Sequence, residues 1–116
     1  VTGLSKLREK DAACMDALDV LKMAVVNGAH AMGLGDADML MPGKMADIIM
    51  IDLHQPNMHP LHHVGKNLVY SGSKQNVVMT MVHGRILYQD GNFYVGEDID
   101  TIYRKVEETT KRLLTL

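Results

Sequence analysis

An uninterrupted apolar run, Ile48 to Ile51, follows a polar turn built on Pro42 and Gly43. The residues just before this run include two charged side chains, Lys44 and Asp47. Apolar residues without alternation, bounded by a turn, are typical of a strand that is buried on both faces. The pattern therefore predicts a strand over residues 46–53, preceded by a loop over residues 36–45.

Upstream of this strand, apolar positions repeat with helical spacing. Asp16 fits the N-cap of a helix, and Asp19 at the third helical position suits its positive end. We expect Asn27-Gly28 to interrupt this helix, residues 29–32 to resume it and Gly33 to end it. A weaker helical segment is predicted over residues 3–11. Three apolar residues of the main helix share a face that we expect to be buried: Leu18, Leu21 and Val25.

The region after the strand predicts a loop, a helical turn and a hairpin. Residues 54–66 are rich in His, Pro and Asn and indicate a surface loop. Residues 67–71 favour a helical turn. Residues 77–82 and 85–89 have the pattern of strands joined by His83-Gly84, since a two-residue loop with Gly second fits the turns that hairpins prefer. A turn over residues 90–92 and a short strand over residues 93–95 follow.

The last segment, residues 98–114, predicts an amphipathic helix. Two i,i+4 pairs of opposite charge, Glu107 with Lys111 and Glu108 with Arg112, mark its solvent face. Its apolar stripe consists of Ile99, Ile102, Tyr103, Val106 and Leu113. Few strands are available to cover the apolar run at residues 48–51. We therefore expect the sheet to need neighbours from further polypeptide or from a second copy.

Composition narrows the function classes. The 116 residues are 47% hydrophobic and 22% charged, which is typical of a globular domain, and the net charge of −2 gives no basic footprint for nucleic acid. No apolar run approaches the ~20 residues that span a bilayer. The single cysteine, Cys14, excludes an internal disulfide and suits a reducing, cytoplasmic compartment. Ten methionines favour core filling over an adaptable interface.

Several polar residues could carry chemistry. His59, His62 and His63, with His54 nearby, suggest a metal site, but a closed site needs about four fixed ligands and this stretch has the pattern of a loop. A structural role is favoured for His30, a turn role for His83, and a role in binding backbone or turn donors for Asp47 and Asp52. Lys44 lacks the frame of a phosphate loop, so we expect its stem to pack on the strand.

The order of five sequence blocks resembles the C-terminal end of metal-dependent amidohydrolases. The closest resemblance is to the branch of methylthioadenosine/S-adenosylhomocysteine deaminases and triazine chlorohydrolases. The blocks are Asp16 to Leu34, Gly43-Lys44 with Ala46-Asp47, the Pro56, Pro60 and Asn67 to Ser71 loop, Val82 to Arg85, and Asp90-Gly91. The residues that carry the motif, in structural roles, are Asn27, Gly28, Gly43, Lys44, Asp47, Asn67, Tyr70, Gly84 and Gly91.

The resemblance implies an α+β fragment: the last helices of a (β/α)₈ barrel, the C-terminal part of a small β-sandwich and a terminal helix. Residues 1–35 would close the barrel, residues 36–97 would form the C-terminal half of the sandwich and residues 98–116 the helix. In that family Zn²⁺ or another divalent metal activates the water that deaminates a purine- or triazine-like ring. None of the family's metal ligands or catalytic residues is matched here, so the resemblance implies a scaffold role and no metal bound by this segment.

Two readings of the function stay open. In the first, the chain is a non-catalytic part of a deaminating amidohydrolase, and its partner is the N-terminal part of the same parent. In the second, it is a non-catalytic β-rich module that acts by self-association, domain swapping or strand addition to a partner, because open sheet edges invite such pairing. Neither reading involves nucleic acid or a membrane.

Overall fold

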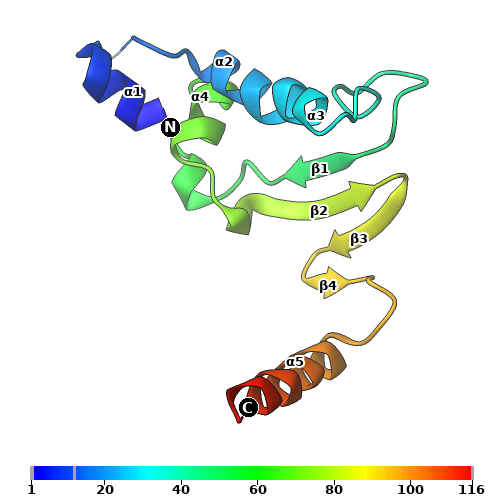
Figure 1. Ribbon diagram of the computed structural model, residues 1–116. Coiled ribbons are helices and arrows are strands. Elements are labelled where there is room, and N and C mark those ends of the chain that lie inside the picture. Colours follow the sequence, from blue (N-terminus) through cyan, green and yellow to red (C-terminus); the bar gives the residue numbers. More distant parts are fainter. Residues whose placement is uncertain (1, 12, 116) are drawn as a thin grey trace.

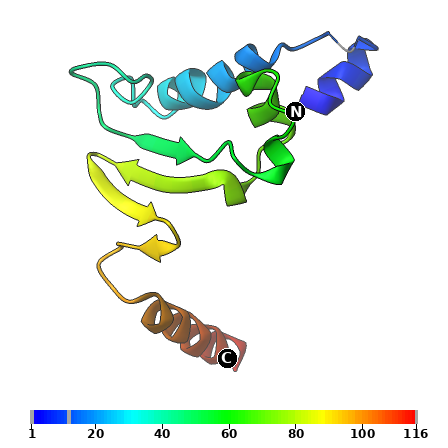
Figure 2. The same cartoon turned by 180° about the vertical axis from the view of Figure 1, so that it is seen from behind.

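The computed structural model describes residues 2–11 and 13–115 and is an α+β arrangement around one four-stranded antiparallel sheet. The strands follow the order of the chain, β1-β2-β3-β4. Helices gather beside β1 at one end of the sheet, whereas the C-terminal helix stands apart beyond β4 (Figures 1 and 2). The elements are α1 (Thr2–Glu9), α2 (Ala17–Lys22), a π-helical turn (Met23–Asn27), α3 (Gly28–Ala31), β1 (Ile48–Ile51), a 3-10 turn (Pro56–Met58), α4 (Val64–Tyr70), a 3-10 turn (Lys74–Asn76), β2 (Val77–Val82), β3 (Arg85–Gln89), β4 (Asn92–Phe93) and α5 (Ile99–Leu114).

The helical stretch from α2 to α3 begins and ends as predicted but is not interrupted where expected. Asp16 caps α2 by accepting a hydrogen bond from Leu18 N at 3.3 Å. Asn27 and Gly28 both keep right-handed helical angles, so the expected break is wrong; a π-helical turn carries the chain into α3 instead. Gly33, at φ +74°, ends the helix. Its N–H binds His30 O, and Leu34 N binds Ala29 O, which is the Schellman pattern.

The strand after the Pro42-Gly43 turn is shorter and more exposed than the sequence predicts. β1 pairs with β2, Ile48 opposite Met81 and Ile49 opposite Thr80. Among the described strands β1 has no second neighbour, because it lies at the edge of the sheet. Ile49 is therefore 58% exposed, and the expectation of a strand buried on both faces is wrong for this chain.

The hairpin and the two later helices match their predictions closely. His83 (φ +49°) and Gly84 (φ +75°) form a turn of the primed kind between β2 and β3. The predicted helical turn is the end of α4. Asp98 caps α5 by accepting a hydrogen bond from Thr101 N at 3.1 Å. The predicted i,i+4 pairs of α5 are not closed in the described part of the chain; Lys105 pairs with Glu97 instead.

The buried interior is small. Within residues 2–11 and 13–115 the buried apolar side chains are Ala17, Met58 and Met79, and of these only Met58 is completely buried. Most of the methionines are exposed or half-buried, so the prediction that they fill a core is wrong. Leu18 and Val25, expected on a buried helix face, are more than half exposed. These residues lack a covering layer in this chain.

The accessible surface area and the radius of gyration both show that the chain is less compact than a self-contained domain of its size. The chain exposes 9025 Å², whereas a compact protein of 12.9 kDa exposes about 6,300 Å². The Cα radius of gyration is 18.4 Å, whereas a compact domain of this length has about 13 Å. About 2,700 Å² of surface is thus exposed beyond what a self-contained domain would show. No helix in the described ranges has the length and apolarity needed to cross a bilayer.

Candidate functional site

A buried polar network ties the segment between β1 and β2 together. At its centre is Asn76, which is 1% exposed. Its Oδ1 accepts hydrogen bonds from Asn57 Nδ2 at 2.8 Å and from Ser73 N at 2.9 Å. Its Nδ2 donates to Asp52 O at 3.2 Å. We call Asp52, Asn57, Ser73 and Asn76 the Asn76 network; it fixes the end of β1 against the start of β2.

Asn67 organises the neighbouring loop. Its Nδ2 donates to Met58 O at 2.8 Å and to Pro60 O at 3.2 Å, across a cis peptide between His59 and Pro60. Met58 is completely buried beneath this loop. The predicted surface loop is therefore a fixed structure with a buried residue. Tyr70, the other motif residue of α4, is half exposed, and Lys6 Nζ lies 5.8 Å from the centre of its ring.

A second cluster joins α3 to the loop before β1. Asp38, whose side chain is 7% exposed, lies 2.9 Å from Lys44 Nζ and 3.0 Å from His30 Nε2. The hydrogen bond with Lys44, then that with His30, hold the pKa of Asp38 below its usual range. Lys44 also donates to Gly35 O at 2.7 Å. The ammonium group of Lys44 thus fixes its own loop, and Gly43 (φ +89°) forms the turn beside it.

Both aspartates that bracket β1 bind nearby donors, as predicted. Asp47 Oδ1 accepts from His83 N at 2.6 Å, which joins the start of β1 to the hairpin turn. Asp52 accepts from the side chain of Gln55 and from His54 N. The hydrogen bond from Gln55, then that from His54, lower the pKa of Asp52. Asp52 is therefore held as a stable anion, which suits an anchor of the loop and not a proton donor.

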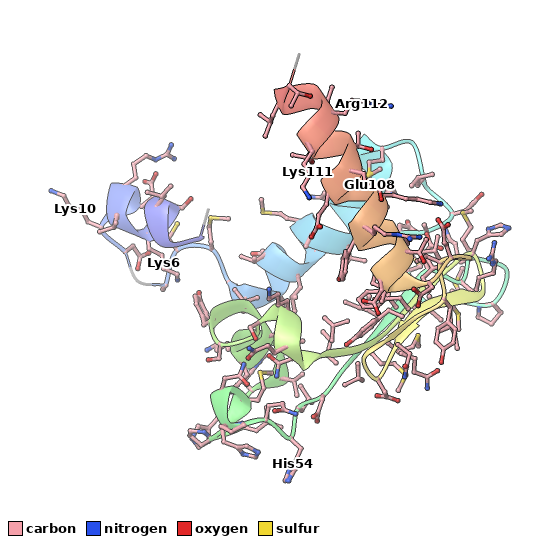
Figure 3. The ribbon with its side chains drawn as sticks, turned by 90° about the horizontal axis from the view of Figure 1, so that it is seen from below. Lys6, Lys10, His54, Glu108, Lys111 and Arg112 are labelled. Atoms are coloured by element: carbon pink, nitrogen blue, oxygen red, sulfur yellow. The ribbon has the colours of Figure 1, made fainter. Side chains whose placement is uncertain are left out.

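The histidines expected in the loop do not converge. The rings of His54 and His59 meet edge to face, with centroids 5.6 Å apart. His63 caps α4 by accepting from Lys66 N at 3.3 Å. Figure 3 shows His54 at the outer edge of the loop. In the part of the chain that the structure describes, no three His, Cys, Asp or Glu side chains are grouped to hold a metal ion.

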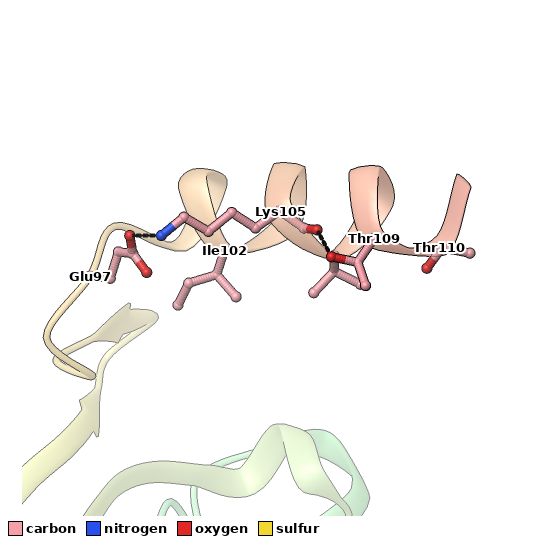
Figure 4. Close-up of a pocket in the computed structure, with 6 residues that line it drawn as sticks. Glu97, Ile102, Lys105, Thr109 and Thr110 are labelled. Carbon is pink, nitrogen blue, oxygen red and sulfur yellow. Dashed lines mark hydrogen bonds and ion pairs between the residues drawn. The ribbon is translucent and has the colours of Figure 1, made fainter. Parts of the chain in front are cut away.

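The remaining feature with functional potential is apolar surface. A groove of about 560 Å³ lies on the sheet and is lined by Val77, Thr80, Leu87, Tyr88, Phe93 and Val95, among others. A smaller groove of about 280 Å³ lies along α5, where Ile102 points toward the side of the sheet (Figure 4). The site that these observations define is structural: two polar anchors and a large uncovered apolar surface.

Known proteins give this arrangement a context. The model of the amidohydrolase family matches residues 2–87. The chain belongs to the amidohydrolase family. The 5-methylthioadenosine/S-adenosylhomocysteine deaminase of Nitratidesulfovibrio vulgaris Miyazaki F is 42% identical over 90 residues, which cover 78% of this chain and 20% of the relative. The 5'-deoxyadenosine deaminase of Methanothermobacter thermautotrophicus is 38% identical over 95 residues, 82% of this chain and 22% of the relative.

Solved structures of this family share the fold. An adenosine deaminase from Xanthomonas campestris with bound zinc superposes with a TM-score of 0.89 at 28% identity, over 99% of this amidohydrolase chain and 26% of the neighbour. An atrazine chlorohydrolase from Arthrobacter aurescens complexed with zinc superposes with a TM-score of 0.70 at 24% identity, over 80% of this chain and 20% of the neighbour. This chain thus spans about a fifth to a quarter of the relatives' length. The resemblance drawn from the sequence blocks is confirmed.

The sequence did not single out Asn76, Asn57 or Asp38. Asn57 lies in the segment read as a surface loop, and Asn76 lies directly before a strand, so their composition indicated exposure. A signal was present in the chain. Asp52 and Asn57 follow the first apolar strand and Asn76 precedes the next, and in an antiparallel pair the end of one strand lies beside the start of the other. It could be recognised only once the pairing of β1 with β2 was known.

Proposed function

We propose that this chain is the C-terminal part of an amidohydrolase that removes the amino group from a purine-like ring. In such a hydrolysis, water adds to the ring carbon that carries the amino group, the C–N bond breaks and ammonia leaves, with no change of oxidation state. Support comes from relatives that are 38 to 42% identical and are named deaminases of adenosine derivatives. A triazine-like ring is the second substrate class, supported by likeness of fold to a chlorohydrolase.

The role proposed for this segment is scaffolding. Residues 1–35 would close the last helical layer of a (β/α)₈ barrel, residues 36–97 would form half of a small β-sandwich, and residues 98–116 would form a terminal helix. The observation that carries this proposal is the surface excess of about 2,700 Å² over a compact monomer. The relatives are about four times as long as this chain, and its apolar faces lack cover. Both facts fit a piece that further polypeptide completes.

The metal of the parent would be held elsewhere. Two neighbouring structures contain zinc. Because the described residues bring no three suitable side chains together, they do not fit a closed zinc site, which takes about four ligands. We therefore assign no catalytic step to this chain. Its motif residues are assigned structural positions only: Asn27, Gly28, Asn67 and Tyr70 in helices, Gly43, Gly84 and Gly91 in turns, and Lys44 and Asp47 in polar contacts before and at the start of β1.

A self-associating β-rich module is the second candidate. The edge strand β1 presents Ile49 and Met50 to solvent, and exposed apolar edge strands pair readily with other chains. This candidate predicts that the 116-residue chain forms a discrete homo-oligomer and complements no enzyme.

A chimera tests the first proposal. The matched segment of the Nitratidesulfovibrio vulgaris deaminase is replaced by this chain, and ammonia release from 5-methylthioadenosine is measured with and without a zinc chelator. We expect a soluble enzyme whose activity the chelator abolishes. A chimera that folds into aggregates or releases no ammonia would contradict the proposal.

A further inference from the structure

Few contacts with the rest of the described chain hold helix α5 in its position. It stands away from the sheet in both views (Figures 1 and 2) and packs extensively against none of the other described elements. An amphipathic helix normally takes its position from the surface that its apolar stripe covers. Here Tyr103 and Val106 are each 57% exposed. The apolar stripe of α5 is therefore directed at something that the described chain does not supply.

The same holds for the part of the sheet that lies nearest to α5. Phe93 and Val95 are about half exposed and line the groove on the sheet together with Leu87. Tyr88 and Phe93 pair across β3 and β4, with ring centroids 5.1 Å apart. This fixes two large rings at the groove, where Phe93 is 49% exposed and Tyr88 is half-buried. Two apolar surfaces, one on the sheet and one on α5, are thus both uncovered.

The size of the uncovered area indicates which class of protein interface would cover it. A standard protein interface removes about 800 Å² from each partner. The excess exposed area of this chain is about 2,700 Å². That amount corresponds to an obligate contact and not to a transient one. Because the excess belongs to the whole chain, it fits a large partner that contacts more than one element.

The comparison with the zinc-bound adenosine deaminase decides between possible occupants. Its superposition covers 99% of this chain, so it includes α5 in its separate position, at a TM-score of 0.89. About three quarters of that neighbour has no counterpart here. A helix set apart from its sheet is therefore an arrangement found within one long polypeptide. A second copy of this chain explains neither the spacing nor its match in that neighbour.

We propose that α5 and the apolar groove of the sheet form a clamp that holds the remainder of the parent polypeptide, and that they capture it even when no peptide bond joins the two parts. This inference rests on the proposed function. The clamp is defined by Ile102 and Val106 on α5 and by Leu87, Phe93 and Val95 on the sheet. Its ligand is a protein segment with an uncharged apolar surface, and the Lys105–Glu97 ion pair lies at the polar rim.

The test mixes the complete 116-residue chain with the Nitratidesulfovibrio vulgaris deaminase truncated immediately before its matched segment. We expect a 1:1 complex in size-exclusion chromatography with light scattering, and restored ammonia release from 5-methylthioadenosine. The double variant Ile102→Gln/Val106→Gln should weaken this binding by about 100-fold, as expected for central apolar contacts.

A matched control lies on the opposite face of the same helix. Arg104→Gln/Glu108→Gln also places two glutamines one turn apart, leaves the net charge unchanged, and alters residues that are exposed (Glu108 is labelled in Figure 3). It should bind as the unchanged chain does. If both double variants bind normally, α5 is not part of a clamp. If the chain alone forms a stable dimer that only the Ile102/Val106 variant disrupts, the occupant is a second copy and the proposal is wrong.

The fused chimera separates failure of this inference from failure of the proposed function. An active chimera together with no complex between the separate parts overturns the clamp alone. An inactive, misfolded chimera overturns the proposed function and the clamp with it.

Discussion

The chain has a small core, and the segment between β1 and β2 differs from the segment after β2 in how its apolar side chains are covered. In the first, hydrogen bonds around Asn76 and Asn67 close a loop over Met58, which is completely buried. In the second, β3, β4 and α5 hold large apolar side chains in place and leave them exposed. The first segment is stabilised by contacts within the chain, whereas the second makes few such contacts and, in our proposal, is completed by a partner. The difference predicts where substitutions act on the isolated chain and where they act only on assembly.

The largest expected effect is that of Asn76→Ala. It leaves Ser73 N, Asn57 Nδ2 and Asp52 O without their buried partner. The Asn76 side chain makes four hydrogen bonds of 3.2 Å or less, and a typical intramolecular hydrogen bond contributes about 1 kcal/mol, so we expect a loss of about 4 kcal/mol in the free energy of unfolding. Urea denaturation followed by circular dichroism measures it. Asn92→Ala, at an exposed asparagine of β4, is the control; equal losses at both positions would show that the two segments do not differ.

Met58→Ala should have the next largest effect. Removing a fully buried methionine side chain leaves a cavity, and such changes cost about 2–5 kcal/mol. The same urea titration applied to Met39→Ala, at a methionine that is 46% exposed, should show a change under about 0.5 kcal/mol. A midpoint for Met58→Ala within error of the unchanged chain would mean that the loop has no packed interior.

The sequence predicted the local elements better than the packing. The hairpin followed from His83-Gly84 and α2 from the cap at Asp16, because caps and tight turns are decided by neighbouring residues, and α5 followed from its helical apolar stripe. The predicted burial of Leu18 and Ile49 was wrong, because burial depends on a covering layer that this chain does not contain. Asn76 was missed because Asp52 and Asn57 are 24 and 19 residues away and meet it only through the fold, whereas the partners of Asp38 lie in its own loop and in α3 and carry no pattern that marks the contact.

Gly84→Ala tests the hairpin turn between β2 and β3, at the start of the second segment. At φ +75° an L-residue with a Cβ is strained, and a single residue held in this region costs about 1–2 kcal/mol. We expect a destabilisation of that size, read from thermal unfolding. No atom lies within 4 Å of the added Cβ, so a larger loss would contradict a purely conformational cause. Gly3→Ala, in α1 and also without a neighbour within 4 Å, is the control.

Acid should weaken the anchor at Asp38. Its pKa is lowered in the folded chain, so its contribution to stability is complete above the pKa of an unfolded aspartate, about 4, and is lost as the pH falls through the lower folded value. The stability difference between the unchanged chain and Asp38→Asn should be constant above pH 5 and shrink below pH 4. Urea midpoints from pH 3 to 6 measure it. Asp100→Asn, at an exposed aspartate of α5, controls for the amide change itself, and a pH-independent difference at Asp38 would contradict the anchor.

The smallest change in the free energy of unfolding is expected for the Ile102/Val106 double variant, which should weaken the proposed complex most. Ile102→Gln/Val106→Gln alters a half-buried and an exposed side chain of α5, a helix that packs extensively against no other described element, and substitutions outside a packed core usually change stability by less than about 0.5 kcal/mol. Urea unfolding of the free chain should therefore hardly register the double variant. Amide hydrogen exchange gives a second reading: α5 should exchange fast in the free chain and slowly in the complex, whereas the amides around Asn76 should be protected in both. Slow exchange of α5 in the free chain, or a loss above 1 kcal/mol in the double variant, would place α5 among the elements that the chain stabilises by itself and remove the distinction between the two segments.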